Sequence, residues 1–193
     1  ADLPRLAGAL CPRCSLESPR GEVCGRCLGE RPHYDATVAA LAYEFPADAL
    51  VHALKFRGEL ALAPLLGELL FQKIEDREVD CIIPVPLSAG RLRERGYNQS
   101  VEIARHLRLG KPEIALCIRS RDTPAQMDLP YAERRRNVRG AFRCTRSLAG
   151  QSVAVVDDVM TTGATLDEIA SVLKQAGAAR VVNWVVARTF RAH

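Results

Sequence analysis

The chain has 193 residues, of which 48% are hydrophobic, so it can bury the core of one domain of ordinary size plus a small appendage. No apolar run approaches the ~20 residues that cross a bilayer, and the opening ADLPRLAGAL lacks the regions of a signal peptide, so we expect a cytoplasmic protein. The formal net charge is +4, and arginines crowd into RLRERGY and ERRRNVRGAFRCTR, which fits either a solvated helix face or contact with phosphate groups.

The first motif along the chain is a pair of CxxC sequences, CPRC and CGRC, with nine residues between them. Without an export signal a disulfide framework is disfavoured, and two such turns at short separation are typical of a tetrahedral zinc site. Redox thiols and iron–sulfur ligation are the alternatives. Because four protein thiolates leave no position for water, we expect a structural Zn²⁺ ion in a zinc-ribbon-like module over residues 1–31. The expected ligands are Cys11, Cys14, Cys24 and Cys27.

From residue 32 onward, predicted strands and helices alternate. Apolar runs rich in β-compatible residues predict strands at 36–45, 79–86, 114–120, 152–158 and 180–189. Helical spacing of apolar residues predicts helices at 47–56, 59–74, 98–109 and 165–177. Because the strands are almost continuously apolar, we expect an α/β fold with an open, mainly parallel sheet flanked by helices on both faces. Ligands of such sheets bind outside the carboxyl ends of the strands.

The stretch VAVVDDVMTTGAT, residues 153–165, puts two acids and a hydroxyl-rich turn at one such strand end. Gly163 lets the backbone turn sharply, so that N–H groups of the turn and of the next helix converge on a point that suits a phosphate. Asp157 and Asp158 would repel a phosphate, but carboxylates accept hydrogen bonds from the vicinal hydroxyls of a ribose. Helix-capping acids, a metal-binding pair and an ordinary strand–helix loop are the alternatives.

The order of these residues resembles the motif that binds phosphoribosyl pyrophosphate (PRPP) in type I phosphoribosyltransferases: four apolar residues, two acids, two spacers and T-T-G-x-T. The resemblance narrows to the ComF-like (GntX-like) branch of that family. It extends through the CPRC and CGRC pair, LVHALKFRGELALA, IPVPLSAGRLRERGYNQ and DTPAQMDLPYAERRRNVRGAF. It implies a phosphoribosyltransferase-like domain over residues 32–193. It also implies Mg²⁺-dependent transfer of a phosphoribosyl group from PRPP to an unknown acceptor, with pyrophosphate leaving.

The resemblance also implies roles for individual residues. The candidate catalytic residues are Asp157 and Asp158, and the candidate PRPP-binding residues are Asp157, Asp158, Thr161, Thr162, Gly163, Ala164 and Thr165. The family's pyrophosphate loop corresponds to Val85, Pro86, Leu87 and Ser88, with Arg91 close behind. Its mobile hood loop corresponds to about residues 121–137, with the candidates Arg121, Gln126, Arg134, Arg135, Arg136 and Asn137. A plain arginine-rich surface loop is the alternative there.

Two functions of other classes remain open. The competence resemblance implies a non-catalytic accessory of DNA uptake, in which the cysteine module and the arginines contact single-stranded DNA or a helicase-like partner at the inner face of the membrane. Few aromatic residues lie within the basic stretches, so a base-stacking platform is poorly supported. A scaffold with a degenerate PRPP site is the third hypothesis, against which the intact acids and threonines argue. Nothing in the sequence indicates the acceptor.

Overall fold

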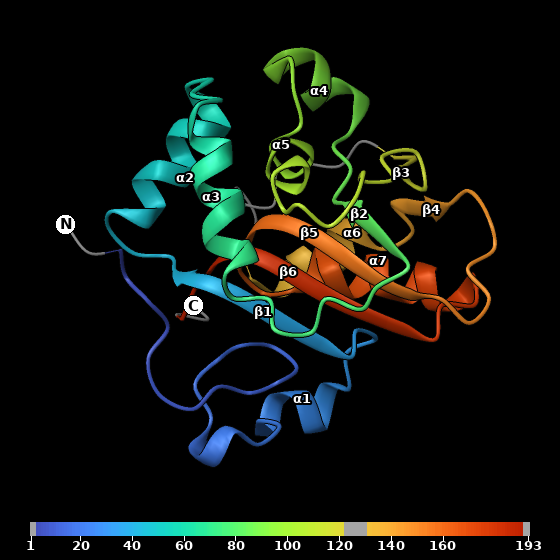
Figure 1. Cartoon of the computed structure of the whole chain (residues 1–193). Coiled ribbons are helices and arrows are strands. Elements are labelled where there is room, and N and C mark those ends of the chain that lie inside the picture. Colours follow the sequence, from blue (N-terminus) through green and yellow to red (C-terminus); the bar gives the residue numbers. More distant parts are fainter. Residues whose placement is uncertain (1–2, 122–130, 191–193) are drawn as a thin grey trace.

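The computed structural model describes residues 3–121 and 131–190, with the backbone alone for residues 131–134. Its centre is a four-stranded parallel sheet in the order β1-β6-β5-β2 (Figure 1). The strands are β1 (Ala36–Ala42), β2 (Cys81–Pro84), β5 (Ser152–Met160) and β6 (Arg180–Arg188). Every residue of β6 after Arg180 is buried, as its continuous apolar run predicts for a central strand covered on both faces. The predicted α/β class is confirmed.

Successive residues of the central strands point into two separate hydrophobic clusters. Ala154 and Val156 face α2 (Ala47–Phe56), α3 (Leu62–Phe71) and α5 (Gln99–Arg105), which lie above the sheet in Figure 1. Val153 and Val155 face the other cluster, which includes the apolar side of α7 (Ala164–Gln175). This two-residue alternation is the one that strand geometry imposes. The core therefore consists of two layers divided by the sheet.

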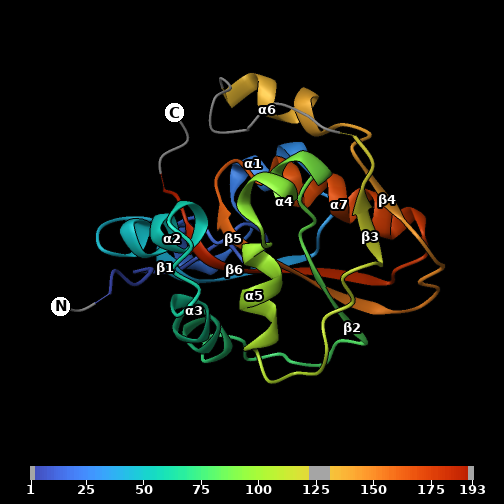
Figure 2. The ribbon, with the colours of Figure 1, turned by 90° about the horizontal axis from the view of Figure 1, so that it is seen from above.

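The strand expected at 114–120 forms only in part, and it lies outside the parallel sheet. It is β3 (Cys117–Arg119), which pairs antiparallel with β4 (Phe142–Cys144) in a two-stranded sheet. The intervening chain includes α6 (Tyr131–Val138), which packs along α7 (Figure 2). Another unexpected element is α4 (Ala89–Arg95), which follows the loop after β2. The backbone groups of a strand as short as β3 can be paired by any neighbouring segment. Its apolar pattern therefore does not predict which sheet it joins.

The four-cysteine module, defined here as residues 3–31, is packed along the edge strand β1. The N–H of Thr37 donates to the carbonyl of Pro12 (3.0 Å), and that of Ala42 donates to the carbonyl of Pro4 (2.8 Å). The short helix α1 (Gly25–Glu30) carries the last of the four cysteines. Because the cysteines share a hydrophobic cluster with residues of β5 and α7, the module and the sheet have a common core.

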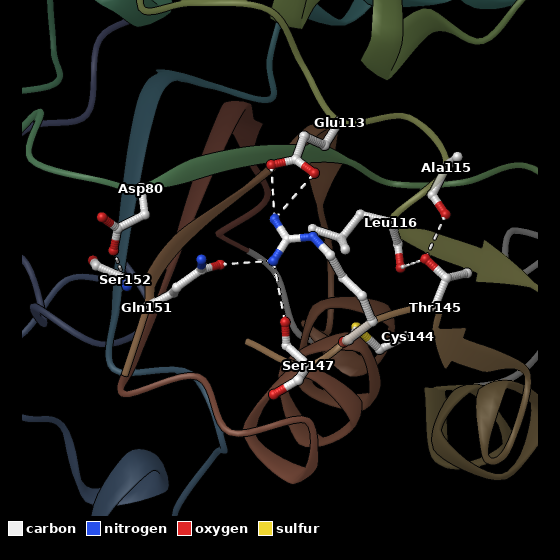
Figure 3. Close-up of polar contacts among 10 residues, drawn as sticks. Asp80, Glu113, Ala115, Leu116, Cys144, Thr145, Ser147, Gln151 and Ser152 are labelled. Atoms are coloured by element: carbon white, nitrogen blue, oxygen red, sulfur yellow. Dashed lines mark hydrogen bonds and ion pairs between the residues drawn. The ribbon is translucent and has the colours of Figure 1, made fainter. Parts of the chain in front are cut away.

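The amino end of the sheet is held by polar contacts at the surface (Figure 3). Asp80, just before β2, accepts a hydrogen bond from the N–H of Ser152, the first residue of β5 (2.7 Å). Arg146 reaches both carboxylate oxygens of Glu113 (3.0 and 3.2 Å) and also the side chain of Gln151 (3.1 Å). We call the two-stranded sheet of β3 and β4 the β3–β4 arm. These contacts attach this arm to the parallel sheet at its amino end, away from the candidate site. Among the described residues, no helix has the length and apolar character needed to span a membrane.

Candidate active site at the carboxyl end of the sheet

The acid pair, Asp157 and Asp158, occupies β5 just beyond its pairing with β2, which ends at Val156. Both residues are nearly inaccessible, with exposed fractions of 8% and 2%. The hydroxyl of Ser100, at the start of α5, donates to Oδ1 of Asp157 (2.9 Å). The ammonium of Lys55, near the end of α2, forms an ion pair with Oδ2 of Asp158 (3.0 Å). Two helices of one layer therefore supply the partners of the acid pair.

The two neighbouring carboxyl groups differ in their affinity for protons. Burial, and then the adjacent Asp158 carboxylate, raises the pKa of Asp157 to about 8. Burial alone would also raise the pKa of Asp158, but the ammonium of Lys55 outweighs it and lowers that pKa below its ordinary value. At neutral pH the pair therefore holds one proton, on Asp157, and one negative charge, on Asp158.

The TTGAT turn, residues 161–165, leads directly from β5 into α7. Gly163 has a φ of +85° and precedes the first residue of the helix. A Cβ at this position would lie 2.7 Å from Cε of Met160 and 3.2 Å from the hydroxyl oxygen of Tyr34, so a side chain there would require these neighbours to shift and would also strain the backbone. The N–H of Ala164 donates to the hydroxyl of Thr162 (3.1 Å). The turn thus connects the strand that carries the acid pair to the amino end of α7.

The loop after β2, residues 85–88, lies beside the same strand end. Its Val85 donates its N–H to the carbonyl of Val156 (2.9 Å), so the main chain follows β5 up to the acid pair. The side chain of Asn98 donates to the carbonyl of Val85 (3.0 Å). Ser88 caps α4 by accepting a hydrogen bond from the N–H of Arg91 (3.4 Å). The structure therefore brings the predicted pyrophosphate loop and the predicted PRPP motif to one edge of the sheet.

Among the predicted hood residues, Arg135 lies beside the turn, where it lines a crevice with Thr162 and Gly163. The guanidinium of Arg135, on α6, forms ion pairs with Glu30 of α1 (3.1 Å) and Asp167 of α7 (3.5 Å). Arg121 donates to the carbonyls of Arg139 (2.7 Å) and Asn137 (3.5 Å). These bonds hold the first residue of the predicted hood stretch next to its last residues. Arg136 is exposed. Gln126 and the side chain of Arg134 lie outside the described residues.

The four cysteines of the module converge on one point. Their sulfur atoms all lie within 4.8 Å of one another, and those of Cys14 and Cys24 are 3.7 Å apart without forming a disulfide. A tetrahedral ion with metal–sulfur bonds of ~2.3 Å would hold its sulfur atoms ~3.8 Å apart. The cluster is therefore shaped for a structural metal ion.

Comparison with known proteins agrees with this geometry. Residues 61–189 match the family model described as phosphoribosyl transferase domain. The chain belongs to the phosphoribosyltransferase family. It is 38% identical over 192 residues to the DNA utilization protein YhgH of Salmonella typhimurium, an alignment that covers 94% of this chain and 85% of that protein. It is 32% identical over 168 residues to competence protein F of Haemophilus influenzae, covering 80% of this chain and 73% of the relative.

These two relatives place the chain in the ComF-like branch of that family, as its motifs predict. A solved structure titled "Structure of the allosteric regulatory enzyme of purine biosynthesis" aligns with 64% of this chain and 25% of its own, at 27% identity and a TM-score of 0.42.

Three side chains at the candidate site were not among the predicted site residues. Lys55 and Ser100 contact the acid pair, and the buried Arg188 of β6 contacts the turn. Lys55 lies within LVHALKFRGELALA and Ser100 follows the GYNQ sequence, both of which carried the family resemblance. Arg188 had no local signal, because an arginine at the end of an apolar strand ordinarily reaches solvent.

Proposed function

We propose that the protein binds PRPP and transfers its phosphoribosyl group to an acceptor, with release of pyrophosphate. The observation that carries this proposal is the contiguity of the acid pair, the TTGAT turn and the loop after β2 at one sheet edge. A turn that ends at a helix amino terminus suits the 5′-phosphate, because its N–H groups and the helix dipole favour an anion. Thr161, Thr162 and Thr165 add hydroxyl donors.

The acid pair would receive the two ribose hydroxyls. In the ligand-free protein Ser100 and Lys55 occupy acceptor positions on Asp157 and Asp158, so the hydroxyls would share or replace these partners. The negative charge of the pair favours the positive charge that develops on the ribose ring as the bond between C1 and the pyrophosphate oxygen breaks. No covalent nucleophile of the protein is required, since the acceptor forms the new bond at C1.

A divalent cation fits this arrangement. Carboxylate and phosphate oxygens are the ligands that Mg²⁺ prefers, and the acid pair meets the expected pyrophosphate at the loop after β2. When bound, Mg²⁺ would neutralise charge on the leaving pyrophosphate. The chain's own contribution is to bind the ribose through Asp157 and Asp158 and to hold the pyrophosphate with the main chain of residues 85–88. Arg91, one turn into α4, adds positive charge next to that loop.

We assign two further roles within this proposal. The module's metal is Zn²⁺, because four thiolates at tetrahedral spacing favour it, and the ion stabilises a segment too short to fold alone. Elemental analysis should find one zinc per chain, lost in Cys24→Ser. The stretch 121–137 is the hood of the site, and opening of the contacts between Arg135, Glu30 and Asp167 would release α6 to cover bound pyrophosphate and exclude water.

A titration of the whole protein with PRPP and Mg²⁺ tests the proposal. Ligand at about one hundred times its Kd should raise the free energy of unfolding by ~2.7 kcal/mol, seen as a shift in thermal unfolding. Isothermal calorimetry with ribose 5-phosphate and with Mg²⁺ pyrophosphate should then show binding of each half of the ligand. Turnover is tested by pyrophosphate release from PRPP across a panel of nucleobases and amines. Absence of binding by all three ligands would contradict the proposal.

The printed names of the relatives favour a second candidate function. One relative is called a competence protein and another a DNA utilization protein, so the chain can instead be a non-catalytic accessory of DNA uptake that contacts single-stranded DNA or a helicase-like partner. Binding to a fluorescent oligonucleotide over a series of salt concentrations tests direct contact. Affinity that falls steeply with salt would support it, since phosphate contacts release counterions. No binding at low salt would exclude direct contact with single-stranded DNA.

A further inference from the structure

We propose that Arg188 is a positioning residue for the TTGAT turn, and that through it the four-cysteine module controls binding of the 5′-phosphate. This inference rests on the proposed function, since it concerns the same ligand. Arg188 is the last residue of β6 and is 1% exposed. A guanidinium buried to this extent must be satisfied by hydrogen bonds from the surrounding chain.

Arg188 bonds to the module and to the turn at once. Its Nε donates to the carbonyl of Cys14 (2.9 Å), one of the four clustered cysteines. Its Nη1 donates to the carbonyl of Met160 (2.8 Å), the last residue of β5, and also to the carbonyl of Thr161, the first residue of the turn. The carbonyl of Thr189, the residue after β6, is a further acceptor of the same nitrogen (2.9 Å), whose two hydrogens are shared among the three carbonyls. One side chain therefore links three segments that are far apart in the sequence.

The bonds to the turn determine where its amides point. In a trans peptide the C=O of one residue and the N–H of the next point in opposite directions. By holding the carbonyls of Met160 and Thr161, Arg188 directs the N–H groups of Thr161 and Thr162 away from itself. A charge-assisted bond to a carbonyl also polarises its peptide unit and strengthens the N–H as a donor. Arg188 thus orients the N–H groups that would bind the phosphate, and it does so without contacting the ligand.

A second contact ties the turn to the same module. The buried ring of Tyr34 belongs to the cluster that contains Cys14 and Cys27, and its hydroxyl lies against Gly163. A narrow crevice between the module and the turn is lined by Cys27, Tyr34 and Gly163 together with the start of α7. The module and Tyr34 therefore line one side of the turn.

The other half of the ligand site is anchored differently. The loop after β2 is held by the carbonyl of Val156 on β5 and by the side chain of Asn98, at the start of α5. The carbonyl belongs to the sheet itself, and Asn98 precedes α5, a helix of the layer opposite the module. A change in the module should consequently weaken recognition of the 5′-phosphate and leave recognition of the pyrophosphate intact.

Arg188→Lys tests the positioning role, because lysine keeps the charge but cannot reach Cys14 and the turn together. Ribose 5-phosphate and Mg²⁺ pyrophosphate are titrated separately by calorimetry. We expect the affinity for ribose 5-phosphate to fall by about tenfold or more, the effect of one lost charge-assisted hydrogen bond, with pyrophosphate affinity unchanged. Arg146→Lys, the matched control at the other end of the sheet, should change neither affinity.

Wild-type protein provides a second test that needs no substitution. A zinc-selective chelator removes the metal while Mg²⁺ stays in excess, and the near-ultraviolet circular dichroism of the buried Trp184 reports whether the sheet remains folded. The same selective loss of ribose 5-phosphate binding is expected, and zinc should restore it. Equal loss of both ligands, or loss of neither, in the variant and the metal-free protein would overturn the inference. If untreated wild-type protein binds neither ligand, the proposed function itself fails.

Discussion

The two ends of the parallel sheet carry similar charged side chains in opposite circumstances. At the amino end, Arg146 and Glu113 are 42% and 40% exposed and form a bidentate pair in contact with water. At the carboxyl end, Asp157 and Asp158 are almost completely buried, and one of them keeps its proton at neutral pH. In the first arrangement each charge has a partner and also keeps its contact with water, so the loss of hydration free energy is small. The second leaves two acids in a place where folding alone would favour apolar residues.

This contrast helps to separate stability from function. Buried carboxylates raise the free energy of the folded state unless they are neutralised, so their presence indicates a role that burial enables. Glycine shows the same difference. Gly150, before β5, has a positive φ with open space around it, whereas Gly163 has a positive φ and close neighbours. The carboxyl end is therefore where the fold tolerates strain and buried charge, and four sets of variants would measure how far this extends.

The largest effect should come from neutralising the acid pair. Asp157→Asn combined with Asp158→Asn removes the negative charge of the pair and replaces both carboxyl groups, so PRPP affinity should fall by about 100-fold or more in calorimetry, equivalent to roughly 3 kcal/mol. Asp80→Asn, the matched acid at the amino end, should leave PRPP affinity unchanged. An unaltered affinity in the double variant would remove the acids from the ligand site.

Alanine at the two glycines should give the next largest effect. Gly163→Ala adds both a left-handed backbone penalty and a clash with Met160 and Tyr34, so the free energy of unfolding should fall by about 2–3 kcal/mol in urea denaturation. Gly150→Ala meets open space and should lose only about 1 kcal/mol. Equal losses would show that the turn relaxes around the added methyl group.

Opposite pH dependences should follow from substituting one acid at each end. The pKa of Asp157 in the folded protein, about 8, exceeds its ordinary value, so its stabilising contribution is complete only below that ordinary value and is lost as pH rises through 8. Asp157→Asn should therefore gain stability relative to wild type, on the order of 1 kcal/mol between pH 6.5 and 8.

At the amino end, Asp76 has the opposite shift. The N–H of Glu78, and then Arg180, lowers its pKa, so its contribution is present above its ordinary pKa and is lost as pH falls through the lowered one. Asp76→Asn should be less stable than wild type at neutral pH and equal to it in acid. Urea denaturation across pH measures both variants, and parallel curves would contradict the assigned shifts.

The smallest effect is expected at the exposed ion pair. Glu113→Gln should lower the free energy of unfolding by about 0.5 kcal/mol at low salt, and by less at high salt, because solvent screens partly exposed charges. Binding of PRPP should not change. A loss of several kcal/mol would mean that this pair holds the β3–β4 arm more strongly than its exposure indicates.

Much of the fold was predictable because its signals are local. The helix expected at 47–56 forms as α2 with those bounds, and the helix expected at 59–74 forms as a shorter α3, Leu62–Phe71, with Pro64 in the first turn where a missing N–H is tolerated. The helix α4 was not predicted although Ser88 and Gly96 supply its cap signals. Its sequence, AGRLRER, is rich in arginine and lacks the spaced apolar residues that predict a helix.

The candidate site was predictable where one short sequence contains it. The acid pair and the turn are contiguous in the chain, so their order alone indicated a ligand for a strand end. Lys55, Ser100 and Arg188 come from three other elements, and only the packing of the layers brings them to β5. The pKa of Asp157 was unpredictable for the same reason, since it depends on burial and on a neighbour that is itself neutralised by Lys55.

The contacts of Pro4 and Pro12 with β1 have a consequence for how the protein behaves among other copies. An edge strand offers unpaired N–H and C=O groups to any passing strand, which is a route to aggregation. Here the carbonyls of the two prolines take up the N–H groups of Ala42 and Thr37, and proline has no N–H with which to continue the ladder. The four-cysteine module therefore also covers the edge strand β1. A chain that loses its metal would expose the unpaired backbone groups of this strand and would self-associate.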